Sequence, residues 1–185
     1  MWVRLQPDRA KVISRTSNLL ADVGTDILGI SRRDPTTMPY NALLRGRCSR
    51  EGCTYLITTA TAGRRPLFAS FGLAALAASE LWQMECGGRW RLHAWVLMPD
   101  HVHLLVELRL GYLVDAVRLF KGRVARRANV TRRHEGVLWQ RGYHEHAVRH
   151  DEDLPAIARY VIANPVRAGL VRRVGDYPFW NASWL

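Results

Sequence analysis

The chain contains few cysteines. Of its 185 residues only Cys48, Cys53 and Cys86 are cysteine. Four residues separate the close pair and no second pair follows, so the spacing matches neither a disulfide framework nor a paired zinc motif. We interpret all three as reduced thiols of a cytosolic protein.

Long hydrophobic runs are also missing. No apolar run reaches the roughly 20 residues that a membrane-spanning helix needs. The N-terminus does not combine a basic start with a long apolar segment, as a secretory signal would. We therefore expect a soluble, cytoplasmic protein without a membrane partner.

Acidic side chains are outnumbered by basic ones. Lys and Arg together number 27 against 16 for Asp and Glu, which gives a formal net charge of +11. Most of the positive residues are Arg, whose planar guanidinium group suits bidentate contacts with phosphate. This balance favours a polyanionic partner such as a nucleic acid, although a solvated basic surface would give the same composition.

The length fits one domain with an appended segment. Residues 1–39 mix Arg, Asp, Ser and Thr and end in a proline-containing break, so we predict a flexible or peripheral extension there. Residues 40–185 are then expected to form a single domain with a C-terminal tail.

Periodicity predicts the elements of that domain. Strands are expected over residues 54–61, 90–98 and 101–108, and a loop running into a further strand over 138–148. In the second strand, alternation places Trp90, Leu92, Ala94, Val96 and Met98 on one face. The short Pro99-Asp100 break makes the third strand its antiparallel neighbour.

Helices are expected between the strands. The first covers about 69–85, the second about 113–129, and the last begins near Asp151 and ends by Asn164, because Pro165 follows. This order predicts an α+β fold of the ferredoxin-like sandwich kind, with an antiparallel central sheet and helices packed on it.

Two histidines stand one residue apart on the third strand. Because side chains alternate, His101 and His103 share a face, about 7 Å apart along the backbone, and can converge on one divalent cation. On the last helix Tyr160 and Asn164 lie one turn apart. Tyr160 could attack a phosphate polarised by that cation, with the Asn164 carbonyl oxygen as a further ligand.

Each of these patterns has an alternative interpretation. A His-x-His pair often satisfies hydrogen bonds at a sheet edge, and a Tyr beside an apolar stripe often only packs. A second set, Tyr143, His144 and His146, has the same residue types. Spacing alone does not choose between the two sets.

Basic side chains cluster on the helix over 113–129. We expect this surface to contact a phosphate backbone, although it could be only a solvated face. The predicted DNA-binding residues are Arg118, Lys121, Arg126 and Arg127 on the helix, with Arg45 and Arg47 upstream.

Three segments taken in order resemble a known family. Residues 95–108, with His101-Val102-His103, are similar to the His-hydrophobe-His motif of the HUH superfamily of single-strand DNA nucleases. Together with residues 139–144 and 159–170 they resemble the REP-associated tyrosine transposases. The similarity runs from about residue 40 to the C-terminus.

The resemblance implies an HUH-type fold and a site. His101 and His103 would bind Mg2+ or Mn2+, and Tyr160 would be the nucleophile. Asn164 stands where the insertion-sequence relatives have a metal-binding Gln, and its arm is one methylene shorter.

The resemblance also implies an activity. This is cleavage and transfer of single-stranded DNA beside hairpins of repetitive extragenic palindromes, through a 5'-phosphotyrosine, by a nucleoid-associated monomer or homodimer in a bacterial cytoplasm. Two alternatives stay open. One is a non-catalytic domesticated binder of structured DNA or RNA, and the other is a phosphodiesterase that uses water.

Overall fold

The computed structural model of the chain describes residues 49–133 and 135–183. The predicted extension over 1–39 and the predicted DNA-binding residues Arg45 and Arg47 lie outside these ranges. Within them, every helix is too short or too polar to cross a membrane.

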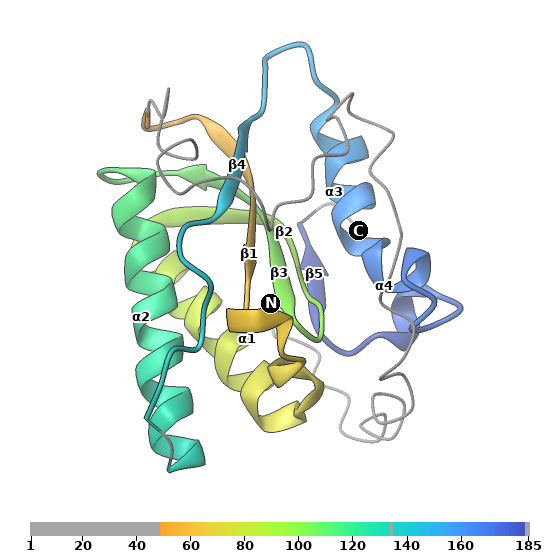
Figure 1. The fold of residues 1–185 in the computed structure, drawn as a ribbon. Helices are drawn as coiled ribbons and strands as arrows, with labels where there is room; N and C mark the ends of the chain where they lie inside the picture. The colour runs from red at the N-terminus through yellow and green to blue at the C-terminus, as the bar shows by residue number, and fades with distance from the viewer. Residues whose placement is uncertain (1–48, 134, 184–185) are drawn as a thin grey trace.

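A five-stranded sheet occupies the centre of the described chain (Figure 1). Its strand order is β4-β1-β3-β2-β5, and all neighbours are antiparallel. The strands are β1 (Thr54–Ala60), β2 (Trp90–Leu97), β3 (His101–Leu108), β4 (His144–Ala147) and β5 (Trp180–Ala182). The predicted antiparallel sheet is confirmed.

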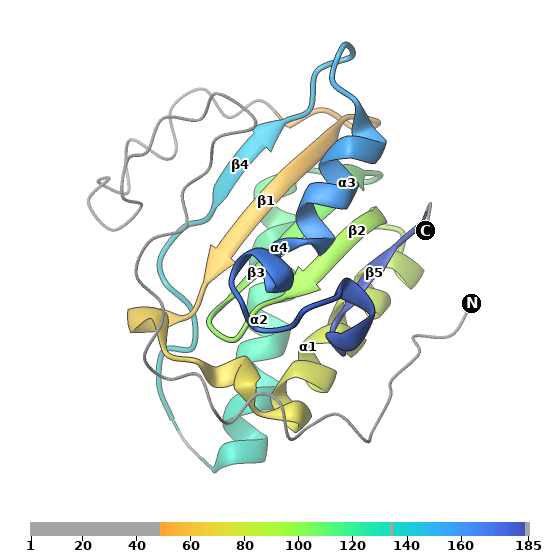
Figure 2. The ribbon, with the colours of Figure 1, turned by 90° about the vertical axis from the view of Figure 1, so that its right-hand side faces the viewer.

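Helices cover both faces of this sheet. Figures 1 and 2 show α1 (Phe71–Cys86) and α2 (Leu113–Arg132) on one face, and α3 (Leu154–Ile162) and α4 (Asn164–Arg167) on the other. Short 3-10 turns are η2 (Ala62–Arg64), η3 (Leu67–Ala69) and η4 (Val174–Asp176). The α+β sandwich is therefore as the sequence predicted.

The central strand β3 is buried by packing on both faces. Trp90 is the Cα partner of Leu108 in the sheet, and its ring packs on Phe120 of α2, with centroids 5.9 Å apart. Because side chains alternate, Leu108 and the other even-numbered residues of β3 face α1 and α2. His101 and His103 consequently point to the opposite face, the one that α3 covers.

The regular alternation predicted for β2 is wrong, because the strand contains a bulge. Leu92 pairs with Val106, but Ala94 pairs with Leu105, so the register shifts by one residue between them. His93 is the extra residue. Ala94 and the residue two further along, Val96, therefore lie on the His103 face of the sheet, whereas Trp90 and Leu92 lie on the α2 face.

Helix α3 has a well-defined start and end. The Asp153 side chain accepts a hydrogen bond from the backbone N–H of Ala156, which caps the helix N-terminus. The helix ends at Ile162, before Pro165, as predicted. Its buried residues Ile157 and Val161 belong to an apolar side that packs on β2, β3 and β5. The helix that carries Tyr160 therefore covers the sheet face to which His101 and His103 point.

The C-terminal segment packs on the body of the domain. Trp180–Ala182 pairs with β2 as the edge strand β5. Just before it, the buried Tyr177 hydroxyl donates a hydrogen bond to the Leu97 carbonyl oxygen over 2.6 Å. Sequence periodicity missed this strand, because three residues are too few to show alternation.

Candidate active site

The two histidines of β3 converge on a single point. The Nε2 atoms of His101 and His103 are 3.1 Å apart, and their rings are almost perpendicular, at 89°. The alternation argument predicted a shared face. The structure adds that the two rings approach each other through their Nε2 atoms.

Polar neighbours hold the other ring nitrogens. The Asp100 Oδ1 atom lies 2.6 Å from His101 Nδ1, and the Thr58 Oγ1 atom lies 2.8 Å from His103 Nδ1. Arg64 donates to Asp100 Oδ2 over 3.2 Å. Sequence reasoning assigned no role to these three residues. Asp100 could have been identified from the sequence, because it directly precedes His101. Thr58 could be found only from the pairing of β1 with β3.

These surroundings shift the pKa values of two groups. Burial, followed by the positive charges of His101 and Arg64, lowers the pKa of His103 well below its ordinary range, so its ring is neutral at neutral pH. Burial of Asp100 raises the pKa of its carboxyl group, but the His101 hydrogen bond and the charges of His101 and Arg64 outweigh it. The net shift is downward, and Asp100 is a carboxylate.

This arrangement fits a divalent cation. Two imidazole nitrogens each about 2.1 Å from one ion, at roughly a right angle, are about 3 Å apart, and the Nε2 atoms here are 3.1 Å apart. Across residues 49–133 and 135–183, no group of three or more His, Cys, Asp and Glu side chains is arranged to hold a metal. Amide, phosphate and water oxygens would suit the remaining positions around such an ion.

Tyr160 is half-buried on α3. The guanidinium group of Arg167 lies over its ring. No hydrogen bond joins the Tyr160 hydroxyl to another residue of the described chain. The predicted nucleophile thus has an uncommitted oxygen, on a helix that packs over the sheet face carrying the histidines (Figure 2).

Asn164 lies one turn after Tyr160, as predicted, but part of its side chain is in use. Its Nδ2 group donates to the carbonyl oxygens of Tyr160, over 3.1 Å, and Val161, over 2.9 Å. It therefore caps the last turn of α3. Only Oδ1 is left to bind a cation.

The second set of candidate residues is divided between two environments. Tyr143 is 6% exposed and lines a cavity beside α2. His146 Nε2 is bound to both carboxylate oxygens of Glu152, at 2.9 and 3.0 Å. That contact connects β4 to the loop before α3. His146 Nε2 is thus already engaged by a carboxylate.

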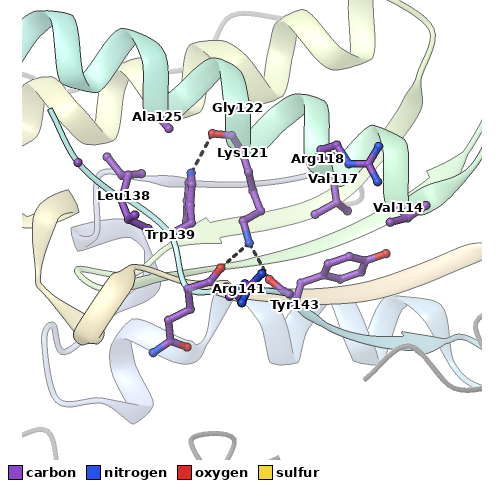
Figure 3. A pocket seen from close by; sticks show the side chains of 14 residues that line it. Val114, Val117, Arg118, Lys121, Gly122, Ala125, Leu138, Trp139, Arg141 and Tyr143 are labelled. Carbon is purple, nitrogen blue, oxygen red and sulfur yellow. Dashed lines mark hydrogen bonds between the residues drawn. The ribbon is translucent and has the colours of Figure 1, made fainter. Parts of the chain in front are cut away.

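The predicted phosphate-binding residues of α2 lie across the sheet from the histidines. A cavity of about 430 Å³ separates α2 from the segment 136–143 (Figure 3). Lys121 crosses it and donates to the carbonyl oxygens of Gln140, over 2.8 Å, and Gly142, over 2.6 Å. Trp139 Nε1 donates in turn to the Lys121 carbonyl oxygen. Lys121 therefore anchors this segment to the helix.

The arginines of α2 differ in their contacts. Arg127 and Arg123 both donate to Glu80, which is only 1% exposed on α1. Arg118 forms an exposed ion pair with Asp115 at 3.1 Å, and Arg126 is exposed. Lys121 and Arg127, two of the predicted DNA-binding residues, are thus engaged by other parts of the domain, whereas Arg118 and Arg126 lie on its surface.

Comparisons with known proteins agree with this architecture. The sequence pattern of the family described as Transposase IS200 like matches residues 49–164. A protein of Haemophilus influenzae is 34% identical over 94 residues, and one of Escherichia coli K12 is 30% identical over 90 residues. Both are named as REP-associated tyrosine transposases.

These matches are partial. They cover 45% and 48% of this chain, and 53% and 52% of the relatives, so the chain spans about half the length of the curated relatives it matches. A solved structure of a REP-associated tyrosine transposase bound to a REP hairpin is similar with a TM-score of 0.60 and 25% identity. That similarity covers 72% of this chain and 79% of the other.

Proposed function

Because the chain belongs to the IS200-like transposase family, we propose that it cleaves single-stranded DNA beside a hairpin and transfers the cut strand through a covalent tyrosine intermediate. The observation that carries the proposal is the convergence of His101 and His103 on the sheet face that α3 covers. The net charge of +11 and the hairpin bound by the structural relative support a DNA hairpin as the partner.

Tyr160 is the proposed nucleophile. Its Oη atom attacks the scissile phosphorus and loses its proton to solvent. The Oη–P bond forms while the P–O3' bond breaks, and the electron pair of the broken bond leaves with the 3' oxygen, which takes up a proton. The products are a 5'-phosphotyrosine and a free 3'-hydroxyl. Because the ester is retained, a returning 3'-hydroxyl can displace Tyr160 and rejoin the strand.

The histidine pair fits the cation that such chemistry uses. A bound Mg2+ or Mn2+ would supply positive charge beside the phosphate oxygens. His101 and His103 would hold it through Nε2, and Asn164 through Oδ1. Imidazole and amide ligands suit Mn2+ at least as well as Mg2+.

The test is cleavage of a hairpin-bearing single strand, with adducts separated on a denaturing gel. Tyr160→Phe should form no adduct and bind DNA with nearly unchanged affinity, whereas Tyr143→Phe is the control that should retain the adduct. An adduct with Tyr160→Phe would contradict the assignment. His101→Ala should lose the cleavage that a chelator abolishes in the wild type.

Two other results would replace the proposal. Binding of the hairpin without any cleavage would identify a non-catalytic binder of structured nucleic acid. Repeated cleavage with no protein-linked DNA at any time point would identify a phosphodiesterase that uses water. Gel filtration with and without the hairpin would separate monomer from homodimer.

A further inference from the structure

We propose that Asp100 and Thr58 are positioning residues that set the tautomers of His101 and His103 in two different ways. Asp100 allows His101 only one neutral tautomer, whereas Thr58 allows His103 either of its two neutral tautomers. The inference rests on the cation site of the proposed function. It is carried by contacts at the far side of each ring from that site.

Asp100 permits only one neutral form of His101. A carboxylate can only accept a hydrogen bond, so His101 Nδ1 must carry the hydrogen and Nε2 must present a lone pair. The carboxylate itself is held in place, because it is 5% exposed and Arg64 donates to its other oxygen. The backbone of Asp100 is held as well, since its carbonyl oxygen accepts from the N–H and the hydroxyl of Thr61.

Thr58 permits both neutral forms of His103. When no cation is bound and His101 is neutral, the lone pair of His101 Nε2 lies 3.1 Å from His103 Nε2, so the hydrogen between them must belong to His103. His103 Nδ1 then accepts from the Thr58 hydroxyl. A hydroxyl can donate or accept, which neither a carboxylate nor a methyl group can do.

A cation would reverse the Thr58 contact. Both Nε2 lone pairs would have to face the ion, so the hydrogen of His103 would have to reside on Nδ1. Thr58 Oγ1 would then accept this hydrogen bond and would need no change of position. The site could thus alternate between a hydrogen-bonded histidine pair and a cation-binding pair without net loss of a proton from either ring.

Nuclear magnetic resonance tests the tautomers directly. Two-bond proton–nitrogen correlation spectra at about pH 8.5, above the ordinary pKa of histidine, distinguish Nδ1–H from Nε2–H rings, and Mg2+ is diamagnetic. His101 should be an Nδ1–H ring with and without saturating Mg2+. His103 should change from Nε2–H to Nδ1–H when Mg2+ is added. A His103 ring that keeps one tautomer throughout the titration would overturn the role of Thr58.

Variants test the contacts by calorimetric titration with Mn2+. Asp100→Asn and Thr58→Val should each weaken Mn2+ binding by about tenfold or more, the usual effect of losing an outer-shell partner. Thr58→Ser should restore wild-type affinity. Matched controls are the exposed residues Asp115→Asn and Thr131→Val, whose affinity should not change. Thermal unfolding of each variant confirms that it is folded.

The outcomes separate this inference from the function on which it rests. If the wild type binds no Mn2+, or His101→Ala binds it equally well, the cation site itself is wrong and the inference falls with it. If the wild type binds Mn2+ and His101→Ala does not, unchanged affinity in Asp100→Asn and Thr58→Val overturns only the inference. Thr58→Ser binding as weakly as Thr58→Val would overturn the role of the hydroxyl.

Discussion

The guanidinium group of Arg167 lies 4.7 Å from the centre of the Tyr160 ring. The chain turns between α3 and α4, and this turn brings a residue seven positions later over the tyrosine. A guanidinium plane over an aromatic ring is attractive and restricts the ring's rotamers. Arg167 therefore holds Tyr160 and places a positive charge beside it.

Removing that charge should slow formation of the covalent adduct. A contact of this kind is worth about 1 kcal/mol, so we expect Arg167→Ala to reduce the single-turnover rate at saturating DNA by roughly fivefold. Arg159→Ala, which removes a half-exposed arginine paired with Asp153, is the control for loss of charge on the same surface. Equal rates in the two variants would show that Arg167 has no specific role in formation of the adduct.

Glu80 should stabilise the fold in a pH-dependent manner. Burial raises the pKa of its carboxyl group, but hydrogen bonds from Arg127 and Arg123, together with their charges, outweigh burial and lower it overall. A group whose pKa is lower in the folded state stabilises the protein above its ordinary pKa. This contribution is lost as the pH falls through the folded pKa.

We expect Glu80→Gln to reduce the free energy of unfolding by about 1–3 kcal/mol at neutral pH, since a buried charged hydrogen-bond acceptor is lost. The difference from the wild type should shrink as the pH falls below the ordinary value of 4.5. Urea unfolding at a series of pH values measures it. Glu135→Gln, at an exposed position, is the control, and a difference independent of pH would contradict the assignment.

Arg118 and Arg126 should contribute to DNA affinity without affecting the chemical step. Both are exposed on α2, across the sheet from His101. If each contacts a phosphate, its change to Ala should reduce the slope of log affinity against log salt by about 1. Cleavage at saturating DNA should keep the wild-type rate. Salt slopes equal to that of the wild type would show that α2 faces solvent in the complex.

Asn164 offers a test of two roles in one side chain. Asn164→Ala should lower stability by about 1 kcal/mol, because the carbonyl oxygens at the end of α3 lose a donor. If Oδ1 also binds the cation, Mn2+ affinity should fall as well. Asn164→Asp should lose at least as much stability, because its carboxylate faces carbonyl oxygens at a helix C-terminus, yet it should retain Mn2+ binding, since it keeps an oxygen ligand. Unchanged Mn2+ affinity in Asn164→Ala would leave Asn164 as a helix cap alone.

Much of the fold follows from local patterns. Alternation predicted β3 and the shared face of His101 and His103, and Pro165 predicted the end of α3, because these features depend on neighbouring residues. The contact between Thr58 and His103 could not be predicted in this way, since it joins positions 45 residues apart and depends on strand register.

The basic residues of α2 show a different limit of prediction from the sequence. Sequence pattern places Lys121 and Arg127 outside the apolar stripe, and nothing local distinguishes them from Arg126. In the folded chain Lys121 reaches two carbonyl oxygens and Arg127 reaches the buried Glu80. Long side chains cover neighbouring surface, so their partners are fixed by tertiary packing rather than by helical position.

The bulge in β2 determines which changes of length this strand can tolerate over evolution. A relative without residue 93 would alternate continuously from Leu92 through Ala94 and keep every later side chain on its present face. A single residue inserted between Ala94 and Trp95 would instead exchange the faces of the residues that follow it and turn the indole of Trp95 toward His103 in place of Val96. Position 93 is therefore where an alignment of this strand should place a one-residue gap.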